Sequence, residues 1–185
     1  MTCIVGLVDD DRVYIGGDSA GVGGYSLTIR KDRKVFQSGG YLLGCTSSYR
    51  MIQLLRYSLT PPVYDGTTDL ERHLTTTFID AVRECFKAGG YAQKTNEQES
   101  AGSFLLGIAG RLFTIDADYQ VGEALDGYDA VGCGSDVALG VLYATPTLKP
   151  SIRIDLALAA AEHHSAGVRG PFYVEVLEPI GAGEA

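Results

Sequence analysis

Strand patterns and helical patterns occur in blocks along this sequence and do not alternate one by one. The blocks, in order, are strands at 2–47, helices at 48–59 and 67–90, strands at 102–134, helices at 135–145 and 151–167, and a strand at 172–178. A parallel doubly wound sheet requires strict alternation of strands and helices. We therefore predict an α+β fold, in which antiparallel sheets are covered by helices on their outer faces.

Local patterns add detail to this prediction. Residues 2–8 and 13–19 are apolar strands joined by "DDDR", which is typical of a hairpin. The glycine-rich 21–24 is interpreted as a turn and the polar 93–100 as a loop. Ser135 or Asp136 is expected to cap the helix that follows "GCG".

Composition narrows the function classes. The 185 residues carry a net charge of −8, and the densest basic stretch, "IRKDRK", is short, so nucleic acid is not an expected partner. No apolar run reaches 18 residues and no secretory signal pattern precedes the first strand, so we expect a cytoplasmic protein with no membrane partner. We also expect residues 1–185 to form a single domain.

Cysteine and histidine patterns predict neither disulfides nor a metal centre. Cys3, Cys45, Cys85 and Cys133 are scattered without a CxxC pair, which is typical of reduced thiols. The adjacent His163 and His164 would point their rings apart. We therefore expect no metal and no cofactor.

The first two residues raise a chemical possibility. A threonine hydroxyl is a weak nucleophile unless a base lies nearby. If Met1 is removed, the α-amine of Thr2 becomes that base, because its ordinary pKa lies near 8. A lysine beside the hydroxyl and a carboxylate beside the lysine would complete the site. Asp18, at the end of the second strand, and Lys34 can supply these groups.

Thr2, Asp18 and Lys34 follow the spacing of threonine, aspartate and lysine in proteasome β-subunits and the bacterial peptidase HslV. The stretches "TCIVGLV", "IGGDSAG", "RKVFQ" and "AVGCGSDVALGVLYA" also resemble this family of N-terminal-nucleophile hydrolases. The resemblance implies a four-layer αββα sandwich with two antiparallel sheets between helix layers. It also implies a threonine-type peptidase in which Thr2 attacks the peptide bond.

The same resemblance implies further site residues. Ser47 would give the oxyanion its backbone N–H, and Cys133, Ser135 and Ser165 would surround the amine of Thr2. Cys133 departs from the family, which usually has serine there, and Ser47 replaces a usual glycine. The substrate would bind along Ser19, Ala20, Gly21, Val22, Gly23 and Cys45.

Three functions remain open from the sequence. In the first, the chain is a peptidase subunit that assembles with copies of itself into rings or stacked rings and acts on peptides or unfolded proteins, with or without an ATPase unfoldase as a partner. In the second, it is a catalytically silent ring subunit, which retention of Met1 would favour. In the third, it is an N-terminal-nucleophile amidase that acts on a small molecule.

Overall fold

A computed structural model describes residues 1–179 and contains two large antiparallel sheets. In the first sheet the strand order is β12-β1-β2-β13. Its strands are β1 (Cys3–Asp9), β2 (Arg12–Gly17), β12 (Tyr128–Gly132) and β13 (Tyr173–Leu177). β1 and β2 form the predicted hairpin, in which Ile4 pairs with Gly17 and Asp9 with Arg12. This pairing brings the end of β2 back beside the start of the chain.

The second sheet has the strand order β11-β10-β9-β6-β5. Its strands are β5 (Val35–Ser38), β6 (Tyr41–Cys45), β9 (Phe104–Ile108), β10 (Arg111–Ile115) and β11 (Val121–Glu123). β9 and β10 turn at Ala109 and Gly110, both with positive φ. Every pairing in both sheets is antiparallel.

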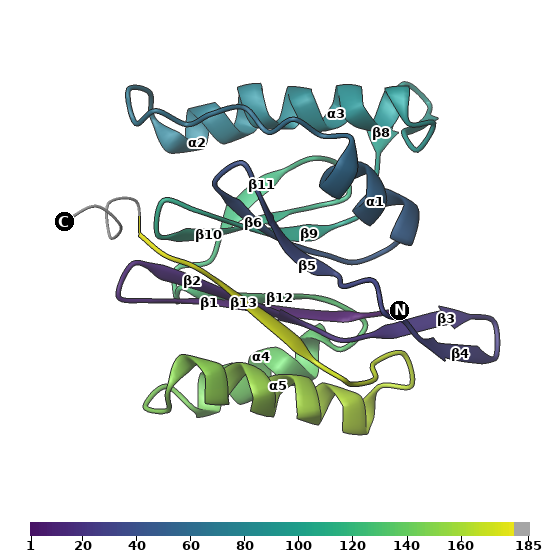
Figure 1. Cartoon of the computed structure of the whole chain (residues 1–185), viewed down its shortest axis with the longest axis vertical. Coiled ribbons are helices and arrows are strands. Elements are labelled where there is room, and N and C mark those ends of the chain that lie inside the picture. The colour runs from purple at the N-terminus through teal and green to yellow at the C-terminus, as the bar shows by residue number, and fades with distance from the viewer. Residues whose placement is uncertain (180–185) are drawn as a thin grey trace.

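Helices cover the outer face of each sheet (Figure 1). The second sheet is covered by α1 (Tyr49–Tyr57), α2 (Leu70–His73), the π-helical turn η1 (Leu74–Phe78) and α3 (Ile79–Ala88). The first sheet is covered by α4 (Ser135–Ala144) and α5 (Pro150–His164). The predicted four-layer αββα sandwich is therefore confirmed, and α1 and α3 lie in one of its helix layers.

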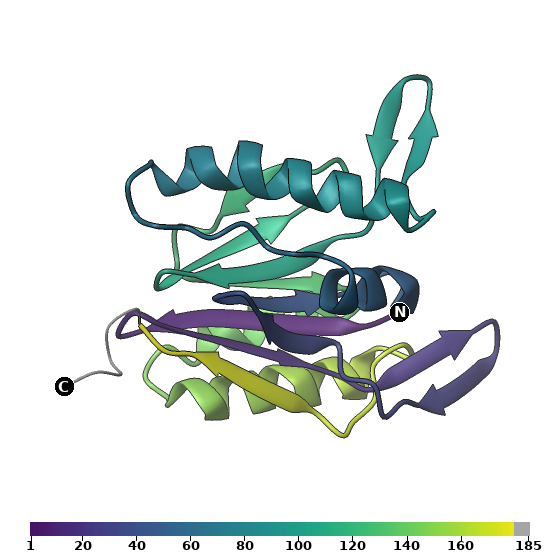
Figure 2. The ribbon, with the colours of Figure 1, turned by 45° about the horizontal axis from the view of Figure 1, so that its top comes forward.

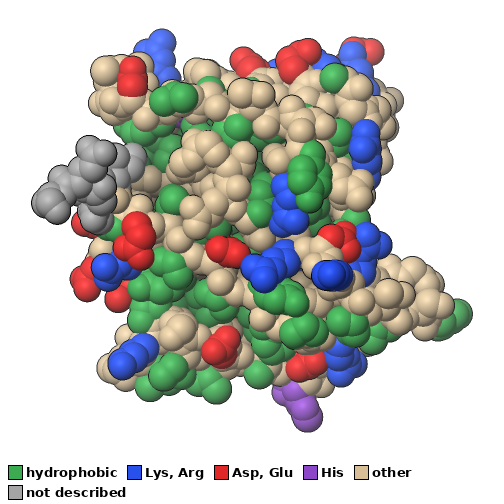
Figure 3. Space-filling view, viewed as in Figure 1, with side chains coloured by type: hydrophobic (Ala, Val, Ile, Leu, Met, Phe, Trp, Pro, Cys, Tyr) green, Lys and Arg blue, Asp and Glu red, His purple; other side chains and the backbone are tan. Residues whose placement is uncertain are grey.

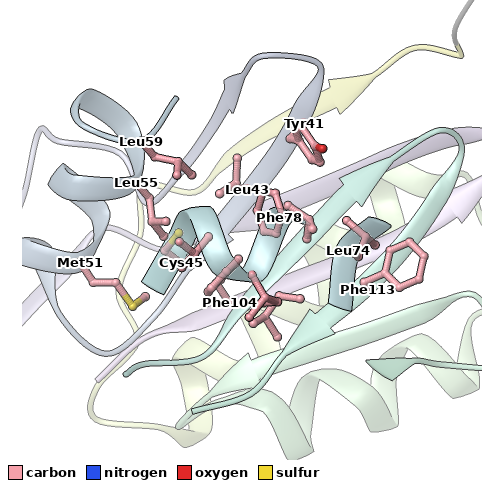
Figure 4. Packing of buried hydrophobic residues seen from close by; sticks show 14 of the residues in the cluster. Tyr41, Leu43, Cys45, Met51, Leu55, Leu59, Leu74, Phe78, Phe104 and Phe113 are labelled. Carbon is pink, nitrogen blue, oxygen red and sulfur yellow. The ribbon is translucent and has the colours of Figure 1, made fainter. Parts of the chain in front are cut away.

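Three apolar clusters hold these layers together. In the cluster between the second sheet and its helices, the Tyr41 and Phe78 rings stack at 4.9 Å (Figure 4). A middle cluster, including Ile4 and Leu42, fills the space between the two sheets. A third cluster seats α4 and α5 on the first sheet. Alternation along each strand produces this arrangement, because successive side chains point to opposite faces.

Two segments that the sequence analysis interpreted as irregular are short hairpins, so those predictions are wrong. Residues 93–100 contain β7 (Gln93–Thr95) and β8 (Gln98–Ser100), which turn at Asn96 and Glu97 with positive φ. The 21–24 stretch lies mostly in β3 (Ala20–Gly23), which pairs with β4 (Ser26–Ile29). Both hairpins project from the sandwich (Figure 2).

The helix cap expected at Ser135 or Asp136 is also wrong. The N-cap of α4 is Gly134, which offers no side chain, and Ser135 is the first helical residue. A Cβ at Gly134 would lie 2.9 Å from the Cβ atoms of Ala161 and Cys3. Close packing of α4 against β1 and α5 therefore explains why residue 134 is a glycine and not a residue with a capping side chain.

The charged side chains on the face shown in Figure 3 are of both signs and interspersed. Within residues 1–179, no helix has the length and apolar character needed to cross a membrane. The chain start, the first turn of α1 and the β3–β4 hairpin meet at one end of the sandwich (Figures 1 and 2). The predicted site residues lie at this end.

Candidate functional site at the start of β1

Thr2 lies immediately before β1 and is buried, with 5% of its surface exposed. Its carbonyl group packs against Gly132 at the end of β12, where φ is +103°. A Cβ at Gly132 would lie 2.2 Å from the Thr2 oxygen, so only glycine allows this approach. The close contact between the start of β1 and the end of β12 therefore fixes the position of Thr2.

Lys34 links Thr2 to Asp18. Its Nζ lies 2.7 Å from Thr2 Oγ1 and 2.8 Å from Asp18 Oδ1. The Lys34 and Asp18 side chains are almost wholly buried, at 1% and 0% exposed. The structure thus brings together the three residues that the spacing singled out.

Backbone groups hold the Asp18 carboxylate in place. Oδ1 accepts the Cys3 N–H at 3.1 Å, and Oδ2 accepts the N–H groups of Ala20 at 2.9 Å and Arg169 at 3.2 Å. These bonds come from β1, from β3 and from the segment before β13. With its position fixed this way, Asp18 orients the Lys34 ammonium toward Thr2.

Burial changes the acid–base chemistry of Lys34. Desolvation lowers the pKa of Lys34 below its ordinary value, and the nearby Asp18 carboxylate opposes that shift. A buried ammonium beside a hydroxyl favours the alkoxide form of that hydroxyl. Lys34 can therefore stabilise negative charge that develops on Thr2 Oγ1.

Met1 occupies part of the site in the intact chain. The Thr2 hydroxyl donates to the Met1 carbonyl oxygen at 2.5 Å. The Met1 side chain packs beside Gly167, where an added Cβ would lie 2.3 Å from the Met1 Cβ. Cleavage of the Met1–Thr2 bond would create the α-amine of Thr2 and vacate this space.

Of the other predicted catalytic residues, Cys133 and Ser165 lie near Thr2. Cys133 Sγ is 3.4 Å from the Thr2 nitrogen, and the Ser165 hydroxyl donates to Cys133 Sγ at 3.3 Å. Ser135 is half-buried in the first turn of α4. No hydrogen bond joins its side chain to Thr2 within the described part of the chain.

A cavity of about 50 Å³ opens beside Thr2 and Lys34. The first turn of α1 and the residues just before it form one wall, and β3 forms another. Its lining consists of Met1, Thr2, Ala20, Val22, Lys34, Thr46, Ser47, Ser48, Tyr49 and Ile52. The positive end of the α1 dipole therefore lies at this cavity.

Ser47 lies in the turn that leads into α1. Its φ is +61°, and the Ser48 N–H donates to the Thr46 oxygen across it at 2.8 Å. The Ser48 hydroxyl caps α1 by accepting the Arg50 N–H at 3.1 Å. The turn therefore has a serine where its positive φ would favour glycine, and it places Ser47 on the cavity wall.

The predicted substrate-binding stretch 19–23 is only partly in the cavity. Ala20 and Val22 line it. Ser19 is buried away from it, and its hydroxyl donates to the Pro171 oxygen at 2.6 Å. Gly23 lies at the outer end of β3, in open space. Alternation along β3 explains why only every second residue reaches the cavity.

Cys45 does not line the cavity and lies in the cluster between the second sheet and its helices. Tyr41, Leu43 and Cys45 follow period two and share the helix-facing side of β6. Burial also raises the pKa of the Cys45 thiol. The prediction that Cys45 contacts substrate is therefore corrected.

Sequence reasoning missed four residues of the cavity wall: Thr46, Ser48, Tyr49 and Ile52. A signal for them existed. The predicted helix at 48–59 follows directly on the predicted strand 41–47, and Ser47 at the end of that strand was already assigned to the site, so the first turn of the helix was expected near the site as well. Among residues 1–179, no group of three or more His, Cys, Asp or Glu side chains could hold a metal ion.

No protein-family model matches the sequence, and no curated protein has a significantly similar sequence. Solved structures do match the fold. Thiobacillus denitrificans BPH has a TM-score of 0.80 and 21% identity, over 96% of this chain and all of that one. Eukaryotic HslV from Trypanosoma brucei has a TM-score of 0.67 and 19% identity, over 96% and 99%.

Anbu, described as an ancestral beta-subunit, from Yersinia bercovieri has a TM-score of 0.65 and 16% identity, over 95% of this chain and 81% of that one. Identities this low establish the fold alone. The similarity covers nearly the whole described chain, so it includes both sheets and both helix layers. The chain therefore has the fold of HslV and its proteasome-like relatives, the N-terminal-nucleophile hydrolase fold.

Proposed function

We propose that this chain is a subunit of a proteasome-like threonine peptidase. Thr2 becomes its nucleophile once the Met1–Thr2 bond is cleaved. The observation that carries the proposal is the buried chain of contacts from Thr2 Oγ1 to Lys34 Nζ to Asp18. A buried lysine–aspartate pair costs desolvation energy that a purely structural role does not require.

In the proposed reaction the Thr2 amine accepts the hydroxyl proton, directly or through one water, as Oγ1 attacks the substrate carbonyl carbon. The Lys34 ammonium stabilises the developing negative charge on Oγ1. The backbone N–H of Ser47 and the N-terminus of α1 stabilise the oxyanion. The Thr2 ammonium then protonates the leaving amine, and water hydrolyses the remaining ester.

Cys133 and Ser165 are proposed to position the Thr2 amine. The thiol is 3.4 Å from the Thr2 nitrogen and is itself held by the Ser165 hydroxyl. Sulfur is a weak acceptor, so the amine is held less firmly than by a hydroxyl. Ser135 has no such contact, and any part it plays would act through the first turn of α4.

We also propose that the subunit assembles with copies of itself, by analogy with the rings of its proteasome-like relatives. Large apolar side chains are exposed in two places that such contacts would cover. One is the β3–β4 hairpin and the other is the outer face of α4 and α5. The side chains are Tyr25, Leu27, Ile29, Tyr143, Ile152 and Leu156.

Hydrolysis of fluorogenic peptides tests the proposal. Protein shown by intact mass to begin at Thr2 is compared with Thr2→Ala and with Thr147→Ala, which alters an exposed threonine between α4 and α5. We expect Thr2→Ala to lose hydrolysis by about 10³-fold or more and Thr147→Ala to retain it. Equal hydrolysis by wild type and Thr2→Ala would contradict a threonine nucleophile.

A further inference from the structure

The cavity beside Thr2 is small. Its volume of about 50 Å³ compares with about 300–1,000 Å³ for pockets that take drug-sized ligands. One ordered water needs about 10–15 Å³ on a similar measure. With Met1 in place, the cavity therefore has room for only a few heavy atoms.

Tyr49 forms the wall that closes the cavity between α1 and β3. It is the first residue of α1, and its hydroxyl donates to the Ala20 carbonyl oxygen of β3 at 3.3 Å. Tyr49 and Ala20 both line the cavity. The ring therefore spans the gap between α1 and β3.

A second contact keeps the Tyr49 ring in that position. The Arg30 guanidinium carbon lies 3.8 Å from the ring centroid, within the range of a cation–π interaction. Arg30 is itself fixed by two hydrogen bonds to Asp32, at 2.9 and 2.7 Å. Swinging the ring out would break the bond to Ala20 and the stacking on Arg30 together.

Gly21 makes this arrangement possible. A Cβ at Gly21 would lie 2.6 Å from Arg30 Cδ and 3.0 Å from its Cγ. The glycine therefore lets the Arg30 side chain cross β3 to reach Tyr49. Gly21 was predicted to contact substrate, but it does not line the cavity and its position faces Arg30 instead.

We infer that Tyr49 restricts the peptidase to substrates with a small side chain, Gly, Ala or Ser, on the residue whose carbonyl group is attacked. The inference rests on the proposed function. Attack brings the carbonyl carbon to about 3–3.5 Å from Thr2 Oγ1, and Thr2 lines the cavity, so the side chain that begins two bonds from that carbon is placed in the cavity in this inference. An aromatic or branched side chain would collide with the Tyr49 ring. Removal of Met1 opens another side of the cavity and leaves this wall in place.

Two series of peptides that differ only at this residue, alanine against phenylalanine, test the inference on the processed protein. We expect wild-type kcat/KM to favour alanine by at least tenfold. Tyr49→Ala removes the wall and is expected to reverse this ratio or reduce it by tenfold or more. The matched control is Tyr57→Ala, which alters the exposed tyrosine at the other end of α1 and should leave the ratio unchanged.

The outcomes separate the two proposals. Cleavage after phenylalanine that equals or exceeds cleavage after alanine in wild type overturns the role of Tyr49 and leaves the threonine peptidase standing. That wild-type ratio decides the question even if Tyr49→Ala fails to fold. A processed protein that cleaves neither series overturns the peptidase and the assigned pocket with it.

Discussion

Three buried side chains, Thr2, Asp18 and Lys34, give the site its chemistry, and each is held by a different part of the fold. Thr2 precedes β1, Asp18 follows β2, and Lys34 precedes β5. The hairpin of β1 and β2 brings the first two together, and the contact between the sheets adds the third. We therefore expect that moving any one of these side chains out of place abolishes peptide hydrolysis while the protein stays folded.

Lys34→Met tests the lysine. The substitution keeps most of the side-chain length and removes the ammonium that stabilises charge on Thr2 Oγ1. We expect kcat/KM for peptides to fall by about 10³-fold or more, with the Asp18 carboxylate still bound by its three backbone N–H groups. Circular dichroism checks that the fold is retained, and activity within tenfold of wild type would contradict the role.

The pH dependence of Lys34 follows from its burial. Because desolvation lowers the pKa of Lys34, its ammonium loses its proton below the ordinary value of 10.5. Between the folded and the ordinary pKa the unfolded chain binds more protons, so this group makes the free energy of unfolding rise with pH in that window. An NMR titration of ¹³C-labelled lysine, assigned with Lys34→Met, measures the value. A Lys34 resonance that titrates with the exposed lysines would contradict this.

Gly132→Ala tests the placement of Thr2. The new Cβ would lie 2.2 Å from the Thr2 oxygen, at a φ of +103°. We expect the free energy of unfolding to fall by about 2 kcal/mol or more and peptide hydrolysis to be lost. The matched control is Gly140→Ala in α4, which has open space around it and should stabilise by about 0.5–1 kcal/mol. Urea denaturation of both variants measures the difference.

At the scale of the secondary-structure elements, sequence patterns predict some hairpins and miss others. The β1–β2 hairpin was predictable because Asp10 and Asp11 accept the positive φ values of its turn. The β7–β8 hairpin was not, because its residues are polar, bury little and form a sheet of only two strands. The side that Cys45 faces follows from the alternation of β6, yet the family resemblance pointed to the opposite face.

Part of the candidate site could also be predicted from the sequence, and part could not. The resemblance placed Thr2, Asp18 and Lys34 from spacing alone, because a hairpin fixes where strand ends meet. It missed Tyr49, because the ring reaches the cavity through contacts with Ala20 and Arg30. Such contacts between elements leave no periodic trace in the sequence.

At the scale of the whole molecule, exposed apolar side chains on the outer helices suggest self-association. Ile152 and Leu156 lie one turn apart on the outer face of α5, and Tyr143 is exposed on α4. An apolar face of this kind is typical of an interface between subunits. The single domain expected for residues 1–185 stays a prediction.

Light scattering tests self-association. We expect a mass that is a multiple of 19.7 kDa at micromolar concentration. Leu156→Glu places a charge in the proposed interface and should shift the mass toward one subunit. Ser151→Glu adds the same charge at another exposed position of α5 and should not. A wild-type mass of one subunit would count against the ring.

The measurement that tests the threonine nucleophile most directly is peptide mass spectrometry after labelling with a peptide vinyl sulfone that carries alanine beside the electrophile. Two thiols compete in principle. Cys133 is exposed near Thr2, whereas burial raises the pKa of Cys3 to about 12 and leaves it unreactive. We predict a single adduct on Thr2 of the processed chain and none on Thr2→Ala. An adduct on Cys133 with Thr2 unmodified would contradict the proposed mechanism.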